Sequence, residues 1–138
     1  MVYIGIDTGT HTGFAVWDNS RNALVEVRTL SIHRAMDKVL LWSHICKEAG
    51  VDFKVIFEDA RQRSETHHRW EKAQGAGSVK RDSSIWEDFL TDYGIPFSAE
   101  PPRRRATKVP DKVFRQYTGW EGRTSEHARD AALIVFNR

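Results

Sequence analysis

Apolar and polar positions alternate in several short stretches of the chain and recur at helical spacing in others. The alternating stretches predict five strands, over residues 2–7, 13–17, 23–29, 53–58 and 95–100. Helical spacing predicts four helices, one between Ser31 and Gly50 and the others over residues 78–93, 110–117 and 125–136. The order of these elements indicates an α/β fold in which helices flank one five-stranded mixed sheet.

The first three strands are joined by short turns rich in glycine and polar residues, so we expect an antiparallel meander in the order 3-2-1. The right-handed crossover rule places the fourth strand beside the first, parallel to it and on the side away from the meander. The fifth strand continues the parallel part. The chain has no internal repeats and no linker, which predicts one domain over residues 1–138.

Three segments have a less regular pattern. Residues 60–77 are polar, basic and without clear periodicity, which predicts a long loop. The helix after Ser31 is expected to bury Ile45, with the single cysteine, Cys46, beside its apolar stripe. The helix over 78–93 is expected to bury Ile85 and Tyr93 in the same way.

Two of the strands end on an acid. Strand 2–7 ends on Asp7, and strand 53–58 ends on Glu58. Because these strands are expected to lie side by side and parallel, their last residues should meet at one edge of the sheet. A buried carboxylate is costly unless a cation or hydrogen-bond donors face it. Asp59 points to the other side of its strand and is left out of this group.

The last helix carries a third acid on an alanine-rich face. His127, Asp130 and Ala131 share that face at helical spacing. If it packs on the sheet edge, His127 and Asp130 converge with Asp7 and Glu58. Three carboxylates in one pocket repel each other unless divalent cations neutralise them. Hard oxygen ligands favour Mg²⁺ or Mn²⁺, and two such ions about 3.5–4 Å apart can promote phosphodiester hydrolysis.

Each of these residues also has an ordinary structural explanation. Asp7 suits a turn, Glu58 a strand end and Asp130 a helix surface. Their joint placement at two strand ends and on one helix face favours a functional site over three unrelated charges. For His127, two interpretations stay open: a metal ligand or proton-transfer partner, or a merely polar neighbour.

Composition restricts the class of protein. With 40% apolar and 29% charged residues, the 138-residue chain is typical of a globular protein. No apolar run approaches the roughly 18 residues of a membrane helix, and no signal-peptide pattern opens the chain. One cysteine excludes a disulfide framework and a thiolate zinc site, which favours a cytoplasmic setting.

Basic residues gather in two clusters although the net charge is only +2. The first cluster falls in the middle of the chain and comprises Arg61, Arg63, Arg69, Lys72, Lys80 and Arg81. The second follows the predicted fifth strand and comprises Arg103, Arg104, Arg105, Lys108, Lys112 and Arg115. Taken separately, each cluster is explained as well by a solvated surface as by nucleic-acid binding.

The ordered set of motifs resembles the RuvC family of Holliday-junction resolvases. The acids lie within Ile4-Gly5-Ile6-Asp7-Thr8-Gly9, Ile56-Phe57-Glu58 and His127-Ala128-Arg129-Asp130-Ala131-Ala132. Between them, Gln74-Gly75-Ala76-Gly77 opens the central helix, and the stretch from Pro101-Pro102 to Lys108 and Lys112 is similar to the family's proline-and-lysine segment. The resemblance spans essentially the whole chain.

This resemblance implies a ribonuclease H-like fold and a Mg²⁺-dependent endonuclease, with two ions per site and Mn²⁺ as a substitute. Asp7, Glu58, His127 and Asp130 would be the metal-binding and catalytic residues. The partner would be a DNA four-way junction, and the protein would be a homodimer joined through helix 78–93. The residues expected to contact DNA are Arg61, Arg63, Lys72, Lys80, Arg104, Lys108 and Lys112.

The chain departs from the family in two respects. Arg61 stands where the family often carries an aromatic residue that wedges the junction, and Trp70, His67 or His68 could take that part. The chain is also shorter than typical cellular members, which suggests a viral-type protein in a bacterial or phage-infected cell.

Three alternatives stay open from the sequence. The same fold and metals could act on RNA–DNA hybrids or flaps. The Gly9–Gly13 turn also resembles the phosphate-binding turn of ATP-binding sugar-kinase-like or actin-like domains, although 138 residues supply one of their two lobes. A catalytically silent junction-binding protein is the third alternative.

Overall fold

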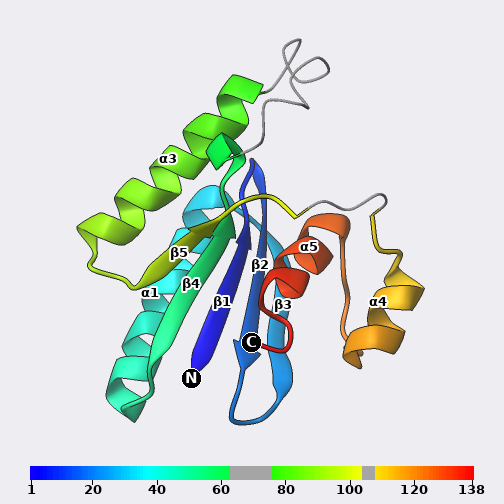
Figure 1. Ribbon diagram of the computed structural model, residues 1–138. Coiled ribbons are helices and arrows are strands. Elements are labelled where there is room, and N and C mark those ends of the chain that lie inside the picture. Colours follow the sequence, from blue (N-terminus) through cyan, green and yellow to red (C-terminus); the bar gives the residue numbers. More distant parts are fainter. Residues whose placement is uncertain (63–75, 104–107) are drawn as a thin grey trace.

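The computed structural model describes residues 1–62, 76–103 and 108–138 (Figure 1). The strands in these ranges are β1 (Val2–Asp7), β2 (His11–Asp18), β3 (Ala23–Ser31), β4 (Phe53–Glu58) and β5 (Phe97–Glu100). The helices are α1 (Ile32–Ala49), the short 3-10 helix η1 (Ala60–Gln62), α3 (Ala76–Asp92), α4 (Asp111–Thr118) and α5 (Glu126–Val135). No helix in the described ranges is long and apolar enough to cross a membrane.

The strands form one mixed sheet in the order β3-β2-β1-β4-β5. Antiparallel pairing joins the first three strands, and β4 and β5 continue in parallel from β1. The predicted meander, crossover and parallel half are therefore confirmed. Ile6 pairs with Phe57 in the β1–β4 register, so Asp7 and Glu58 both end their strands at the same edge of the sheet.

Strand and helix boundaries differ from the sequence prediction by a few residues. Strand β2 begins at His11 because residues 11–13 already pair with β3. The turn after β1 is thus short, and Gly9 occupies it with a φ of 152°, in a region that residues with a Cβ rarely enter. Strand β5 begins at Phe97, and part of the predicted loop 60–77 is helical, since η1 and the start of α3 lie inside it.

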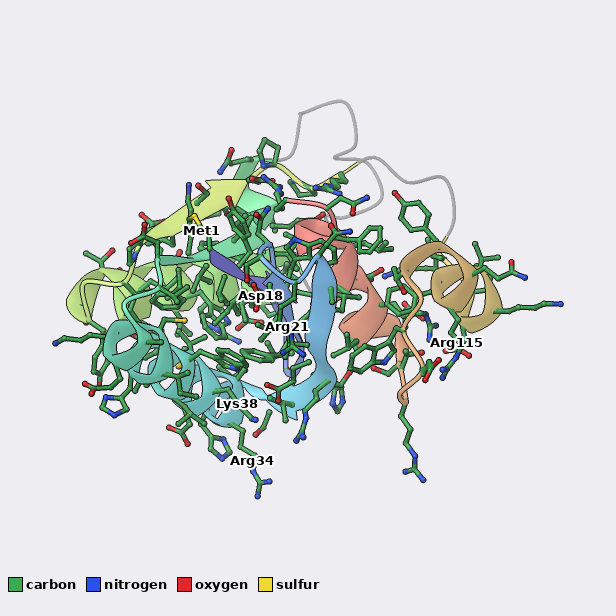
Figure 2. The ribbon with its side chains drawn as sticks, turned by 90° about the horizontal axis from the view of Figure 1, so that it is seen from below. Met1, Asp18, Arg21, Arg34, Lys38 and Arg115 are labelled. Atoms are coloured by element: carbon green, nitrogen blue, oxygen red, sulfur yellow. The ribbon has the colours of Figure 1, made fainter. Side chains whose placement is uncertain are left out.

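Alternation along the strands gives the sheet two apolar faces. Even-numbered residues of β1 and β2 pack with α1 and α3, including Ile4, Ile6 and Phe14. Their odd-numbered neighbours, such as Ala15, pack with α4 and α5 on the opposite face. Figure 2 shows this layering from below, with α1 and α3 on one side of the strands and α4 and α5 on the other. Asp7 and Gly5 share the α5 face.

The helix faces were predicted less well than the strand faces. Cys46 is buried in the α1 core, as expected, whereas its neighbour Ile45 is 43% exposed. Ile85 and Tyr93, expected in the core, are 41% and 61% exposed, while Trp86 is fully buried. Adjacent helix positions point about 100° apart, so one wrong residue in the stripe moves a side chain from the core to the surface.

Helix α5 lies unusually close to the sheet because two glycines leave room for it. A Cβ placed on Gly5 would be 2.2 Å from the carbonyl oxygen of Ala131. One placed on Gly13 would be 1.9 Å from the carbonyl oxygen of His127. Both separations are far below van der Waals contact, so no side chain fits at either strand position. These glycines determine how closely His127 and the next turn of α5 approach Asp7.

We expect Gly13→Ala to destabilise the fold, because the new methyl group must push α5 away from β2. The free energy of unfolding, measured by urea denaturation, should fall by about 1–3 kcal/mol, the usual cost of overpacking a core. Gly77→Ala is the matched control, since a Cβ there meets nothing within 4 Å. That variant should be neutral or slightly more stable. Equal stability of the two variants would contradict the close docking of α5.

Candidate active site

Asp7 ends β1 beneath the first turn of α5. Its carboxylate oxygen Oδ2 lies 2.9 Å from Nδ1 of His127, and its side chain is 23% exposed. Burial raises the pKa of Asp7 above its usual value, against the hydrogen bond from His127, and the negative charge of Asp130 raises it further. Asp7 is therefore a carboxylate that the fold holds in a place unfavourable to its charge.

Asp130 lies one turn after His127 on α5 and is bound by a lysine. Nζ of Lys108 is 2.7 Å from Oδ2 of Asp130 and 3.1 Å from Oε1 of Glu126. The hydrogen bond to Asp130 is the main cause that raises the pKa of Lys108. Lys108 itself is well exposed, so its ammonium group sits at the solvent side of the acidic face.

Glu58 reaches the same side of the sheet from β4. Ile56, two residues earlier, packs in the α5 core, so alternation puts Glu58 on that face as well. Its Oε1 accepts a hydrogen bond from the backbone N–H of Arg103, at a donor–acceptor distance of 3.4 Å. The structure thus brings the three predicted acids and His127 to one end of one face, from β1, β4 and α5.

The donor set suits a hard divalent cation in kind. Carboxylate oxygens are typical ligands of Mg²⁺ and Mn²⁺ sites, and burial raises the pKa of Asp7 although His127 and Lys108 act to lower it. Within the described ranges, however, no three His, Cys, Asp or Glu side chains are gathered closely enough to hold a metal ion. A cation would therefore have to draw Asp130 from Lys108 and bring Glu58 and Asp7 toward it.

The residues predicted to bind DNA fall into three groups. Lys80 on α3, Lys112 on α4 and Lys108 are exposed. Arg63, Lys72 and Arg104 lie outside the described residues, as do His67, His68 and Trp70.

Arg61, the remaining predicted DNA contact, lies at the surface but is held by two acids of the protein itself. Its guanidinium group donates to both carboxylate oxygens of Asp59, at 2.8 and 2.9 Å, and to Glu87 on α3. The Arg61 hydrogen bond lowers the pKa of Asp59, which is nearly fully buried. Asp59 is thus the partner of Arg61 and lies outside the acidic group, as its strand position indicated. A DNA contact by Arg61 would compete with these ion pairs.

Sequence reasoning missed His11 as a neighbour of the site. Its ring stacks on that of His127, with centroids 6.3 Å apart and planes 23° from parallel. His11 is exposed at the start of β2. The signal was available, because the hairpin that leaves Asp7 uncovered also carries His11, but the turn was predicted to extend through residue 13.

The strand order and the helices on both faces of the sheet define an α/β protein with a ribonuclease H-like fold. Among solved structures, the chain matches the structure of Thermus thermophilus RuvC over 99% of its own length and 92% of that chain. The TM-score is 0.55 and the sequence identity is 18%. The protein therefore has a RuvC-like fold, as the motifs indicated. No protein-family model matches the chain, and no curated protein matches it significantly.

We expect Asp7→Asn to stabilise the metal-free protein at neutral pH. The raised pKa means that the folded state disfavours ionised Asp7, so its charge lowers stability fully above the folded pKa. Asparagine removes the charge and keeps an oxygen that can accept from His127. Urea denaturation should show a gain for Asp7→Asn at pH 7 that disappears as the pH falls below the ordinary value of 3.8.

Asp37→Asn, on an exposed position of α1, is the control for that comparison and should leave stability nearly unchanged. A loss of stability in Asp7→Asn at pH 7 would show that the interaction of Asp7 with His127 outweighs the cost of burial.

Proposed function

We propose that this protein is a Mg²⁺-dependent, structure-selective DNA endonuclease that resolves four-way (Holliday) junctions. The observation that carries the proposal is the convergence of Asp7, Glu58 and Asp130 from two parallel strand ends and one helix. The acids occupy this arrangement in a RuvC-like fold. Since adjacent carboxylates repel, their gathering on one partly exposed face is explained best by a cationic ligand.

Asp7 would hold both metal ions. Glu58 and Asp130 would each contribute to one ion, and His127 would complete one ligand set or orient Asp7 through its Nδ1 contact. When bound, such ions supply an activated water and stabilise the leaving oxygen of the phosphodiester. The proposed products carry 5′-phosphate and 3′-hydroxyl ends.

The contacts of Lys108 support a role for this residue in binding DNA. In the absence of an ion it neutralises Asp130, and it is exposed beside the acids. If Asp130 held a cation, the ammonium group of Lys108 would become available to a phosphate of the DNA strand. Lys80 and Lys112 are further exposed cations for the backbone of the junction arms. Such contacts provide affinity and orientation without sequence preference.

The decisive assay compares synthetic DNA substrates in Mg²⁺. We expect the wild type to cut a four-way junction into nicked duplexes faster than a flap, an RNA–DNA hybrid or a plain duplex. Asp7→Asn should cut at least about 1000-fold more slowly, since a metal supplies several kcal/mol of transition-state stabilisation. Asp37→Asn should retain the wild-type rate.

The other outcomes separate the alternatives. Faster cutting of the hybrid or the flap would replace the substrate and keep the metal chemistry. Junction binding without cutting would identify a catalytically silent binding protein. Undiminished cutting by Asp7→Asn would contradict the proposed mechanism. ATP binding without nuclease activity would favour the kinase-like alternative.

We further propose that the enzyme is a homodimer joined through α3. This helix exposes Ile85 by 41%, and Tyr93, just beyond its end, by 61%. Phe89 lies between them in sequence, is only partly buried, and contacts Tyr93 at a ring-centroid distance of 5.1 Å. Large apolar side chains along one helix are an interaction surface of the kind that a second copy covers. Two active sites would then face two strands of one junction.

The dimer proposal predicts that Ile85→Lys produces a monomer, because it buries a charge in the proposed interface. Sedimentation equilibrium at micromolar concentration should give half the wild-type mass. Val113→Lys is the matched control, because Val113 is a similarly exposed aliphatic residue, 50% exposed, on α4. A monomeric wild type, or a dimer that survives Ile85→Lys, would contradict the use of α3.

A further inference from the structure

Helix α5 is held differently on its two sides. Toward β1 and β2 it packs directly on backbone, at Gly5 and Gly13. Toward β4, which carries Glu58, it packs on Ile56, and two arginine side chains also donate hydrogen bonds to its last turn. Polar contacts therefore add to apolar packing in placing Asp130 relative to Glu58, whereas the relation between His127 and Asp7 depends on close packing against backbone.

Arg103 makes the central contact on the β4–β5 side. It follows β5 by three residues, and its Nη1 donates to the carbonyl oxygen of Leu133 at 2.8 Å. Its Nη2 reaches the carbonyl oxygen of Ile134 at 3.3 Å. The last carbonyl groups of a helix have no partner inside the helix and carry a partial negative charge. A forked guanidinium group can satisfy two of them at once.

The backbone of the same residue contacts Glu58. Its N–H donates to Oε1 of Glu58 at 3.4 Å. Arg103 therefore touches one proposed metal-binding acid with its main chain and, with its side chain, the helix turn that follows Asp130. Pro101 and Pro102, which precede it, limit the freedom of the connection because proline has a fixed φ. The link between Glu58 and α5 thus runs through a single residue.

A second arginine reinforces this arrangement. Nη2 of Arg138 is 2.7 Å from Oε2 of Glu100, and its Nε donates to the carbonyl oxygen of Ile134 at 3.1 Å. Glu100 pairs with Glu58 in the β4–β5 register. The C-terminal end of α5 is therefore connected to the ends of both parallel strands.

We propose that Arg103 is a positioning residue, which sets the place of Asp130 on α5 relative to Glu58 on β4. The inference rests on the proposed nuclease function and deepens it. It also separates Arg103 from the rest of the second basic cluster, since its side chain donates to helix carbonyl groups. Arg103 would act through the two acids and would touch neither substrate nor metal.

The test separates positioning from DNA contact with two arginine variants. We expect Arg103→Gln to lower kcat for junction cleavage by about 10–100-fold, the usual effect of residues that orient metal ligands. The Mg²⁺ concentration for half-maximal rate should rise. Junction affinity in EDTA, and its dependence on salt, should stay within twofold of the wild type. Arg103→Lys should show most of the defect, because one ammonium group cannot replace the fork.

Two further variants calibrate the measurement. Lys112→Gln removes a proposed phosphate contact, so it should weaken junction binding and reduce the log–log salt slope by about 0.9. Arg34→Gln, on α1 at the opposite side of the sheet (Figure 2), should behave as wild type. If Arg103→Gln behaves like Lys112→Gln, or if Arg103→Lys restores full activity, Arg103 acts as a positive charge that binds DNA phosphates. Either result overturns the inference.

A structural readout keeps the inference testable apart from catalysis. Hydrogen exchange of the α5 backbone in the metal-free protein should accelerate in Arg103→Gln, while exchange in α1 stays unchanged. Unchanged α5 protection would overturn the positioning role even if activity falls. A wild type that cuts none of the substrates would overturn the proposed function, and the exchange experiment would still decide whether Arg103 holds α5.

Discussion

The approach of α5 to the sheet is the constraint on which the rest of the structure depends. It exists because Gly5 and Gly13 lack side chains where the carbonyl oxygens of Ala131 and His127 lie. The alanine-rich face of α5 completes the fit, with Ala128, Ala131 and Ala132 buried. This contact buries the apolar core between α5 and the sheet and places His127 over Asp7. Packing and the proposed chemistry therefore share the same few residues.

The three acids repel one another, and each has a hydrogen-bond partner within the protein. Asp7 faces His127, Asp130 faces Lys108, and Glu58 faces the backbone of Arg103. Each acid therefore has a partner within the protein, and the proposed cation would have to compete with these contacts. Burial nevertheless raises the pKa of Asp7, so the ionised side chain lowers the stability of the folded protein.

The basic residues outside the acidic group differ in what they contact. The first basic cluster includes Arg61, which binds buried Asp59 and ties η1 to α3 through Glu87. The second includes Arg103, which binds α5. A count of basic residues along the chain cannot separate such internal partners from exposed cations such as Lys80 and Lys112. Only their neighbours in space distinguish them.

The sequence by itself determined the sheet, because strand alternation and the crossover rule depend on local pattern and chain chirality. It also determined that Asp7 and Glu58 end adjacent strands, and the spacing of His127 and Asp130 placed them on one helix face. Tertiary structure alone decided which side of α1 and α3 is buried, that His11 stacks on His127, and that Arg61 and Arg103 have internal partners. These features depend on contacts between residues that are far apart in the sequence. A local pattern of apolar and polar positions does not specify which distant residues meet.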